Sequence, residues 1–187
     1  MRSPDEALQL IRGFAPSAGE AKSRELILAM VEETREPFSR RQFNPGHITC
    51  TALVVHPDRT CVLLAYHHRL RRWLLPGGHV EERDVSLADT ARREAIEETS
   101  IEIAPVPGRL VGMDVNGIPA NKKKKEPFHL HHDLVFAFLA ASGDFMRSEE
   151  APEIVWCSPG DFARYAAPLN IIRAAERALQ TGSPLMG

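Results

Sequence analysis

The stretch PGGHVEERDVSLADTARREAIEETSI, residues Pro76–Ile101, places seven carboxylates and three arginines directly after a Pro-Gly-Gly turn. Its second half, Ser86–Thr99, reads as the clearest helix of the chain. Ser86 and Asp89 have the spacing of a capping box, and small apolar residues recur on one face of the expected helix. The stretch therefore predicts a loop followed by a well-delimited acidic helix.

Three carboxylates of this helix share a face, because Glu94, Glu97 and Glu98 are three and four residues apart. A bound divalent cation would turn their mutual repulsion into attraction, and carboxylate oxygens are ligands that Mg²⁺ and Mn²⁺ prefer. Gly77 and Gly78 allow a backbone conformation that brings a carbonyl oxygen close to a ligand. The alternative is an ordinary acidic helix face in contact with solvent.

The segments around this stretch change between helical and strand periodicity. Residues 1–45 are expected to form an N-terminal helical extension, and residues 46–187 the main domain. A polar turn at 57–60 predicts a hairpin, and Pro-Gly-Gly is expected to end a strand that passes through Trp73. The order predicts an α/β fold, a mixed sheet with helices packed on it. Helices are expected at 4–14, 19–38, 86–99, 161–165 and 170–180, and further strands at 47–56, 61–67, 101–106, 109–115, 129–140 and 153–158.

Composition narrows the class of protein. The 187 residues suit one domain, and a net charge of −2 gives no general argument for nucleic-acid or membrane binding. No apolar run approaches the roughly 20 residues of a membrane span, and the N-terminus has no secretory-signal core. Cys50, Cys61 and Cys157 are odd in number and widely spaced, so we expect buried thiols and a cytoplasmic protein.

The segment REAIEETSI, Arg93–Ile101, resembles the second half of the Nudix box, G-x5-E-x7-R-E-U-x-E-E-x-G-U, where U is apolar. Gly78 matches the opening glycine of the box. The apolar strands that end in WLLPGGHVE and the later segment EEAPEIVWCSPGDF agree with the flanking pattern of the family. The resemblance covers residues 46 to 181 and implies a Nudix-like α/β/α sandwich after the N-terminal extension.

The box departs from the family pattern at two places. Eight residues, one more than the pattern has, separate Asp84 from Arg93, and Asp84 is an aspartate where the family has glutamate. Ser100 stands in place of the closing glycine, a substitution with a cost if that position has a positive φ. The residue that fills the early acidic role is therefore left open.

The resemblance implies a hydrolase that cleaves the pyrophosphate bond of a nucleoside diphosphate linked to another moiety, using an activated water and Mg²⁺ or Mn²⁺. The implied metal ligands are the carbonyl of Gly78 and the carboxylates of Glu94, Glu97 and Glu98. The three glutamates and Arg93 are the implied catalytic residues, and Glu94 and Glu98 are both candidates for the general base. Arg93 is expected to orient a glutamate by a charge-assisted hydrogen bond.

Weaker features point to substrate contacts. His129, His131 and Asp133 alternate along one expected strand face, either as a substrate-contacting or extra metal-binding row or as a plain polar face. Arg69 and Arg72 lie in a basic segment that this fold would place near the substrate entrance, the alternative being a plain basic surface.

Two other functions compete with hydrolysis. A Nudix-like domain that binds a nucleotide or nucleotide sugar as a sensor accounts for the altered spacing, but has no need for all three glutamates. An isopentenyl-diphosphate isomerase-like enzyme needs a catalytic cysteine, and Cys50 and Cys61 lack a supporting motif. The expected partner is a small nucleotide-type substrate, with no membrane or specific nucleic acid. The substrate's identity, the role of Lys122–Lys125 and the oligomeric state, of which a homodimer is one option, stay open.

Overall fold

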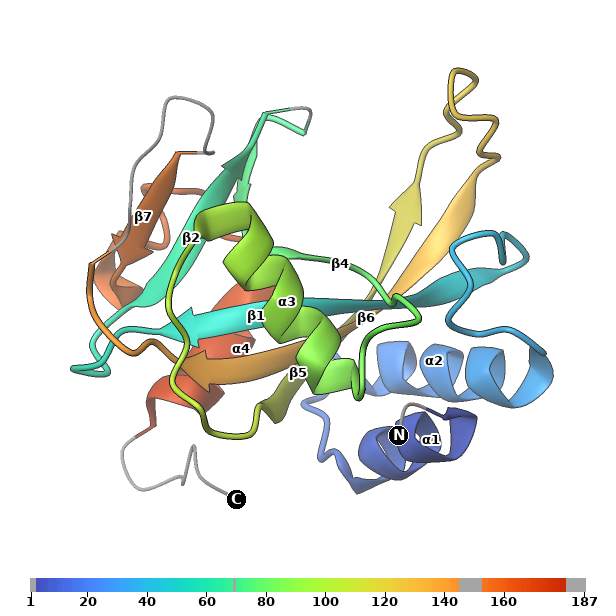
Figure 1. Cartoon of the computed structure of the whole chain (residues 1–187), viewed down its shortest axis with the longest axis horizontal. Helices are drawn as coiled ribbons and strands as arrows, with labels where there is room; N and C mark the ends of the chain where they lie inside the picture. The colour runs from blue at the N-terminus through green and yellow to red at the C-terminus, as the bar shows by residue number, and fades with distance from the viewer. Residues whose placement is uncertain (1–2, 69, 145–152, 181–187) are drawn as a thin grey trace.

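The computed structural model describes residues 3–68, 70–144 and 153–180, which form one mixed sheet with helices on both faces (Figure 1). The strands are β1 (Gly46–Val55), β2 (Val62–His67), β3 (Arg72–Leu74), β4 (Gly77–His79), β5 (Arg109–Ile118), β6 (His129–Leu139) and β7 (Ile154–Cys157). The helices are α1 (Pro4–Gly13), α2 (Ala21–Glu33), α3 (Leu87–Thr99), α4 (Leu169–Leu179) and the short 3₁₀ helix η1 (Pro159–Asp161).

The sheet has the order β3-β2-β1-β6-β5, with β7 paired to β2 and β4 paired to β1. Strands β1 and β6 run parallel, and the other pairs are antiparallel. The hairpin expected around the turn at 57–60 is confirmed, although β1 and β2 pair only where Val55 meets Val62. The first half of β1 is therefore free to pair with β4.

The sequence predicts no strand at Gly77–His79, since Pro-Gly-Gly there indicates only the end of the preceding strand, but the structure forms β4 at these residues. Its Gly77 lies opposite Thr51 of β1. A methyl group added at Gly77 would lie 2.6 Å from Thr51 Oγ1 and 2.8 Å from the carbonyl oxygen of Cys50. The glycine thus allows a backbone approach that any side chain would obstruct.

Two apolar clusters pack against the two faces of the sheet. One face, which includes Ile48 and Cys50 of β1, packs against α3 and against the N-terminal helices α1 and α2. The other face, which includes Leu53 and Val55, packs under α4. Figure 1 shows α3 in front of the sheet and α4 behind it. The expected α/β/α sandwich is confirmed.

The N-terminal helices share a core with the sheet. Ile11 of α1 and Ile27 of α2 are fully buried in the cluster that contains α3. Arg177 of α4 also donates two hydrogen bonds to the carboxylate of Glu20, which precedes α2, one of them at 2.7 Å. The division between 1–45 and 46–187 stays a prediction, but the two segments pack closely.

Several expected boundaries were wrong. Helix α2 ends at Glu33, short of residue 38, and the Thr34 hydroxyl caps it by donating to the Met30 carbonyl at 2.7 Å. The expected strand at 101–106 is only a single bridge to β6's end, because Pro105 and Pro107 have no N–H to donate.

The last helical segments also shift. The expected short helix at 161–165 is the 3₁₀ turn η1 at 159–161, and Pro168 is the N-cap of α4. Asn170 does not cap this helix, since its amide donates to the Asp114 carboxylate at 2.9 Å. The three cysteines are free thiols, with Cys50 and Cys157 buried as expected. Among the described residues, none of the helices has both the length and the apolar character needed to span a bilayer.

Candidate active site on helix α3

Local sequence sets both ends of α3. At its start, Ser86 Oγ accepts the Asp89 N–H at 3.1 Å and donates to the Asp89 carboxylate at 2.9 Å, so the expected capping pair forms. At its end, Ser100 has a φ of 54°, the left-handed conformation that favours glycine. Ala91 and Ala95 face the core, which leaves the acidic face of the helix free.

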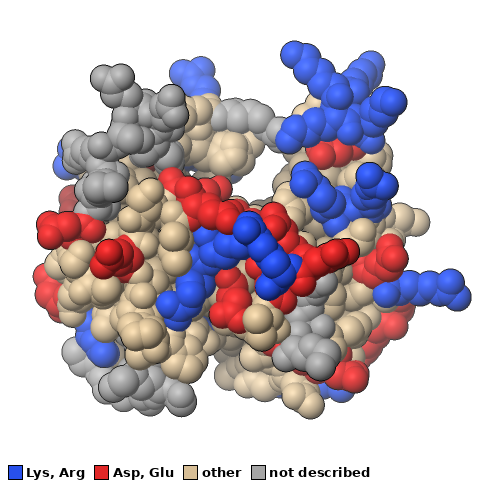
Figure 2. Space-filling view, viewed as in Figure 1, with Lys and Arg blue, Asp and Glu red and all other residues tan. Residues whose placement is uncertain are grey.

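Two of the implied metal ligands, Glu94 and Glu98, lie beside the Gly-Gly turn, while the carboxylate oxygens of the three described glutamates do not all converge within 4.8 Å. A methyl group added at Gly78 would lie 2.5 Å from the Glu94 carboxylate. The N–H of Gly77 donates to the Glu98 carboxylate at 3.3 Å. The Glu97 side chain is 46% exposed and that of Glu94 only 16%. Figure 2 shows acidic side chains gathered across the middle of this face of the molecule, with basic side chains crossing between them.

Arg93 connects these carboxylates. Its Nη1 donates to Glu94 at 2.9 Å and to Glu97 at 3.1 Å. Its Nε and Nη2 donate to the two Asp84 oxygens at 2.8 and 3.0 Å, and Nη2 also donates to the His79 carbonyl at 2.9 Å. Spacing on the helix predicts only the Glu97 contact, while the others depend on how the loop before α3 folds.

Asp84 accepts from Arg93 in spite of the extra residue in the box. It is 8% exposed, and its carboxylate also accepts the Thr90 hydroxyl at 2.9 Å and the Glu81 N–H at 2.8 Å. Burial opposes ionisation, but these bonds outweigh it and lower the pKa of Asp84 to about 2. The added residue is absorbed in the loop, where Val85 is 68% exposed. Asp84 has one methylene fewer than the glutamate of the family pattern, and the loop between Asp84 and α3 has one residue more, so the shorter side chain still reaches Arg93.

The glutamate face keeps more negative charge than Arg93 neutralises. Desolvation raises the pKa of Glu94 although Arg93 opposes it. Desolvation, followed by the charge of Glu94, raises the pKa of Glu98 to about 7, although by surface area Glu98 is exposed. Clustered, partly desolvated carboxylates of this kind fit a divalent cation with oxygen ligands.

A second polar region lies on the opposite face of the sheet. Asp133 of β6 accepts hydroxyl hydrogen bonds from Thr49 at 2.9 Å and from Thr51 at 2.8 Å. Burial raises the pKa of Asp133 to about 6, against the lowering effect of both threonines. Thr51 also lies directly under Gly77, so this region adjoins the Gly-Gly turn. Alternation along each strand predicts that Thr49 and Thr51 share a face of β1 and that Asp133 lies on a polar face of β6. Only the pairing of β1 with β6 brings these residues into contact.

The expected histidine row is part of a larger cluster. His131 lies opposite His47 of β1, with ring centroids 4.9 Å apart, and His79 is 5.1 Å from each of them. His129 stacks on His47 at 5.2 Å. Burial, then neighbouring histidines, lowers the pKa of His79 to about 4 and that of His131 to about 3, so both rings are neutral at pH 7. Sequence reasoning missed His47 and His79.

The basic residues lie elsewhere. Arg72 begins β3 and is exposed, and no contact joins it to the glutamates in the part of the chain that the structure describes. Arg69, the other expected substrate contact, lies outside the described residues. Lys122–Lys125 are exposed in the loop between β5 and β6, where a bridge between Asn121 and Glu126 closes the loop's base.

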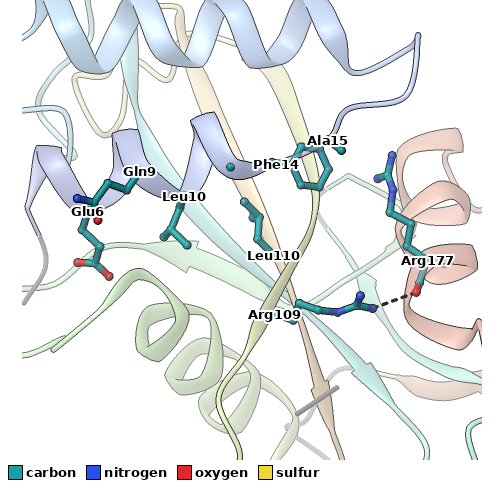
Figure 3. A pocket seen from close by; sticks show the side chains of 9 residues that line it. Glu6, Gln9, Leu10, Phe14, Ala15, Arg109, Leu110 and Arg177 are labelled. Carbon is teal, nitrogen blue, oxygen red and sulfur yellow. Dashed lines mark hydrogen bonds between the residues drawn. The ribbon is translucent and has the colours of Figure 1, made fainter. Parts of the chain in front are cut away.

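A pocket of about 660 Å³ lies apart from the glutamates, between α1, β5 and α4 (Figure 3). Its walls include Phe14, Leu110 and Arg177, and Arg109 donates to the Arg177 carbonyl at 3.0 Å beside it. None of its lining residues belongs to the glutamate set. This hollow follows from the packing of the N-terminal helices against the sheet.

Comparison with known proteins identifies a matching family and a sequence relative. The NUDIX domain family matches residues 46–177. A probable DHNTP pyrophosphohydrolase of Lactococcus lactis subsp. cremoris (strain MG1363) is 33% identical over 163 residues, covering 81% of this chain and 92% of that protein.

Two solved structures are also similar. A Nudix family hydrolase from Clostridium perfringens is 20% identical with a TM-score of 0.47, covering 71% of this chain and 95% of that one. An Ap4A hydrolase of C. elegans is 17% identical with a TM-score of 0.49, covering 71% and 98%. From the family and sequence matches, the expected enzyme class, a pyrophosphohydrolase acting on an acid anhydride, is confirmed, and the chain belongs to the Nudix family.

Proposed function

We propose that this chain hydrolyses the pyrophosphate bond of a nucleotide-type triphosphate or a related nucleoside diphosphate derivative, with Mg²⁺ or Mn²⁺ bound at α3. The proposal depends chiefly on one observation: Gly78 meets the Glu94 carboxylate so closely that an added methyl group would lie 2.5 Å from it. That approach brings a backbone turn to the glutamate face, as a metal-phosphate site requires.

The glutamates and Arg93 have distinct roles in this proposal. Gly78, through its carbonyl, and Glu94 and Glu97 would hold the cation, which leaves the Glu98 carboxylate available as the base. When bound, the cation supplies charge neutralisation at the phosphate oxygens and lowers the pKa of a water. Arg93 is a positioning residue, because it donates to Glu94 and Glu97 while Asp84 holds its other edge. The water oxygen forms a new P–O bond, and the anhydride P–O bond breaks.

The general base accepts the proton of the attacking water. Glu98 and Glu94 are both candidates, and desolvation holds the pKa of Glu98 at about 7, where a carboxylate is a better proton acceptor. Glu94 is already committed to Arg93 at 2.9 Å. We therefore favour Glu98 as the base and Glu94 as a ligand.

The Lactococcus relative supports the proposed substrate class. Its name describes a pyrophosphohydrolase of DHNTP, dihydroneopterin triphosphate, and it is 33% identical to this chain. We include this pterin triphosphate among the proposed substrates, with nucleoside triphosphates as the comparison. Asp133, with Thr49 and Thr51, is a proposed contact for the ring system, because a half-buried carboxylate can accept ring N–H groups. His131, Arg69 and Arg72 stay weaker proposed contacts.

A substrate screen with Mg²⁺ tests this proposal. Dihydroneopterin triphosphate, nucleoside triphosphates, ADP-ribose, dinucleoside polyphosphates and nucleotide sugars would each be assayed for phosphate or pyrophosphate release. Glu97→Gln and Glu98→Gln are each expected to lower kcat by about 10²–10³-fold, and Glu102→Gln, an exposed carboxylate beyond α3, to leave it unchanged. Unchanged turnover in both helix variants would refute the assignment.

The sensor alternative makes a different prediction. A domain that only binds its ligand would show saturable binding in calorimetry and no product with any compound of the screen. The ion pair of Asp84 with Arg93 weakens the main reason for that alternative, since the altered box spacing leaves the arginine held by a carboxylate.

A further inference from the structure

A cluster of imidazole rings on the sheet enters the proposed hydrolysis only through His131, a weaker proposed substrate contact. His47, His79 and His131 each offer one ring nitrogen, and these three atoms lie within 4.8 Å of one another. The rings come from β1, β4 and β6, so strand pairing on both sides of β1 brings them together. His47 is 1% exposed, and the other two are half-buried.

His47 has a nitrogen without a partner. Its Nδ1 lies 3.0 Å from the Gln42 carbonyl, an arrangement that places the proton on Nδ1 and leaves the lone pair on Nε2. That Nε2 is buried and has no hydrogen-bond partner. A carbonyl that fixes the ring and its tautomer in this way is the usual support of a metal-bound histidine. A buried acceptor without a donor is otherwise costly.

This cluster is separate from the glutamate face. Successive residues of a strand point to opposite faces, and Gly78 faces Glu94 on the α3 side. His79, the next residue, therefore points to the other face, where His47 and His131 also lie. The two sites stand back to back across β4.

We infer that His47, His79 and His131 form a binding site for a borderline divalent transition-metal ion, Zn²⁺ above all. Three imidazoles suit Zn²⁺ better than Mg²⁺, which prefers oxygen ligands. Zn–N bonds of about 2.0–2.1 Å in a tetrahedron need nitrogens roughly 3.3 Å apart, so the three nitrogens, now within 4.8 Å of one another, would have to draw closer on binding. Three protein ligands leave a fourth position for water or a substrate atom.

Two positive side chains and one negative side chain lie near the three imidazole rings. Arg40 and Lys124 act on these rings as positive neighbours and oppose a cation, while Glu126 acts on His47 as a negative one. His129 stacks on His47, but its Nδ1 lies 2.9 Å from the Pro127 carbonyl, and it is not one of the three converging rings. The three ligands are uncharged imidazole rings, so the affinity for Zn²⁺ would come from their geometry and burial and not from ligand charge.

Calorimetry of the chelator-treated full chain with Zn²⁺, in excess Mg²⁺ to occupy the oxygen site, tests the inference. One Zn²⁺ per chain is expected, and His79→Asn and His131→Asn should each weaken it by about 10–100-fold. Co²⁺ in place of Zn²⁺ should give the visible absorption of a tetrahedral nitrogen site in the wild type and lose it in both variants. Zn²⁺ should also raise the melting temperature of the wild type more than that of either histidine variant.

Two controls separate this site from its neighbours. His56, Asp58 and Cys61 form a second group with converging ligand atoms, so the double variant His56→Asn, Cys61→Ser should keep the Zn²⁺ affinity. The double variant Glu97→Gln, Glu98→Gln should keep it as well, which makes the result independent of the proposed hydrolysis. Equal binding by wild type and both histidine variants, with each variant folded by circular dichroism, would overturn the inference, as would loss of binding in either control.

Discussion

Asp84 and Arg93 form a two-pronged ion pair across the loop that precedes α3, with Nε–Oδ1 and Nη2–Oδ2 distances of 2.8 and 3.0 Å. The pair is mostly buried, with the two side chains 3% and 13% exposed. Paired, planar contacts of this kind fix the orientation of a guanidinium as well as its charge. The remaining nitrogen of Arg93 is thereby aimed at Glu94 and Glu97.

The first prediction concerns Asp84→Asn. Removing the Asp84 charge leaves the mostly buried Arg93 without its closest ion pair, with only Glu94 and Glu97 opposite it, so the free energy of unfolding should fall by about 3 kcal/mol. The value of kcat should fall more than KM rises, because Arg93 no longer holds Glu94 and Glu97. Urea denaturation and steady-state kinetics measure both effects. Glu82→Gln, an exposed carboxylate of the same loop, should change the free energy by less than about 0.5 kcal/mol. Equal effects of the two variants would show that the pair is not what holds Arg93.

The second prediction concerns Gly78→Ala. The new methyl group would collide with the Glu94 carboxylate at 2.5 Å, so either the turn or the glutamate must move. Mg²⁺ should bind at least about tenfold more weakly, since ligand geometry is what Mg²⁺ demands most. Titration calorimetry with Mg²⁺ measures this. The matched control is Gly160→Ala, where the nearest atom, Ser158 Oγ, is 3.8 Å from the added carbon. Wild-type Mg²⁺ affinity in Gly78→Ala would argue against a metal site at this turn.

The third prediction concerns Ser100→Gly at the end of α3. Ser100 adopts a φ of 54°, a conformation that costs a residue with a Cβ and costs glycine little. The substitution should stabilise the protein by about 0.5–1 kcal/mol in denaturant titration. Ser23→Gly, inside α2, should act in the opposite direction by a few tenths of a kcal/mol. A destabilised Ser100→Gly variant would mean that the serine hydroxyl has a role outweighing the strain.

The fourth prediction concerns stability in acid. Burial opposes ionisation of Glu20, but hydrogen bonds from Arg177 and Ser17 lower its pKa from 4.5 to about 2. The folded protein therefore binds a proton less readily than the unfolded chain. The stabilisation is complete above about pH 4.5 and is lost as the pH falls towards 2.

Glu20→Gln tests this linkage. The variant should be less stable than wild type by on the order of 2–3 kcal/mol at pH 7, and the difference should shrink as the pH approaches 2. Thermal unfolding across this range measures it. Glu25→Gln, an exposed carboxylate on the same helix, should run parallel to wild type at every pH. A Glu20→Gln difference that is constant with pH would mean that packing, and not ionisation, ties α2 to α4.

Much of the candidate site could be predicted from the chain alone, because its determinants are local. Ser86 caps the helix that starts beside it, and Glu94, Glu97 and Glu98 share a face by helical spacing, whatever the rest of the fold does. A cost was expected at Ser100 if its position had a positive φ, and its φ is 54°. The hairpin, the mixed sheet and the family followed from patterns of the same short range.

The remaining features were decided by tertiary structure, since they join residues that no short pattern relates. Asp84 meets Arg93 because the longer loop folds back on α3, and β4 finds a partner because β2 leaves that edge of the first half of β1 open. Asp133 finds Thr49 and Thr51, and His131 finds His47, through the register of two parallel strands more than eighty residues apart in sequence. Residue spacing determined which carboxylates share the helix face of this Nudix enzyme. Strand register and loop closure depend on burying both faces of the sheet at once. They decided that Asp84 holds Arg93 beside the glutamates and that the histidine cluster lies on the opposite face of the sheet.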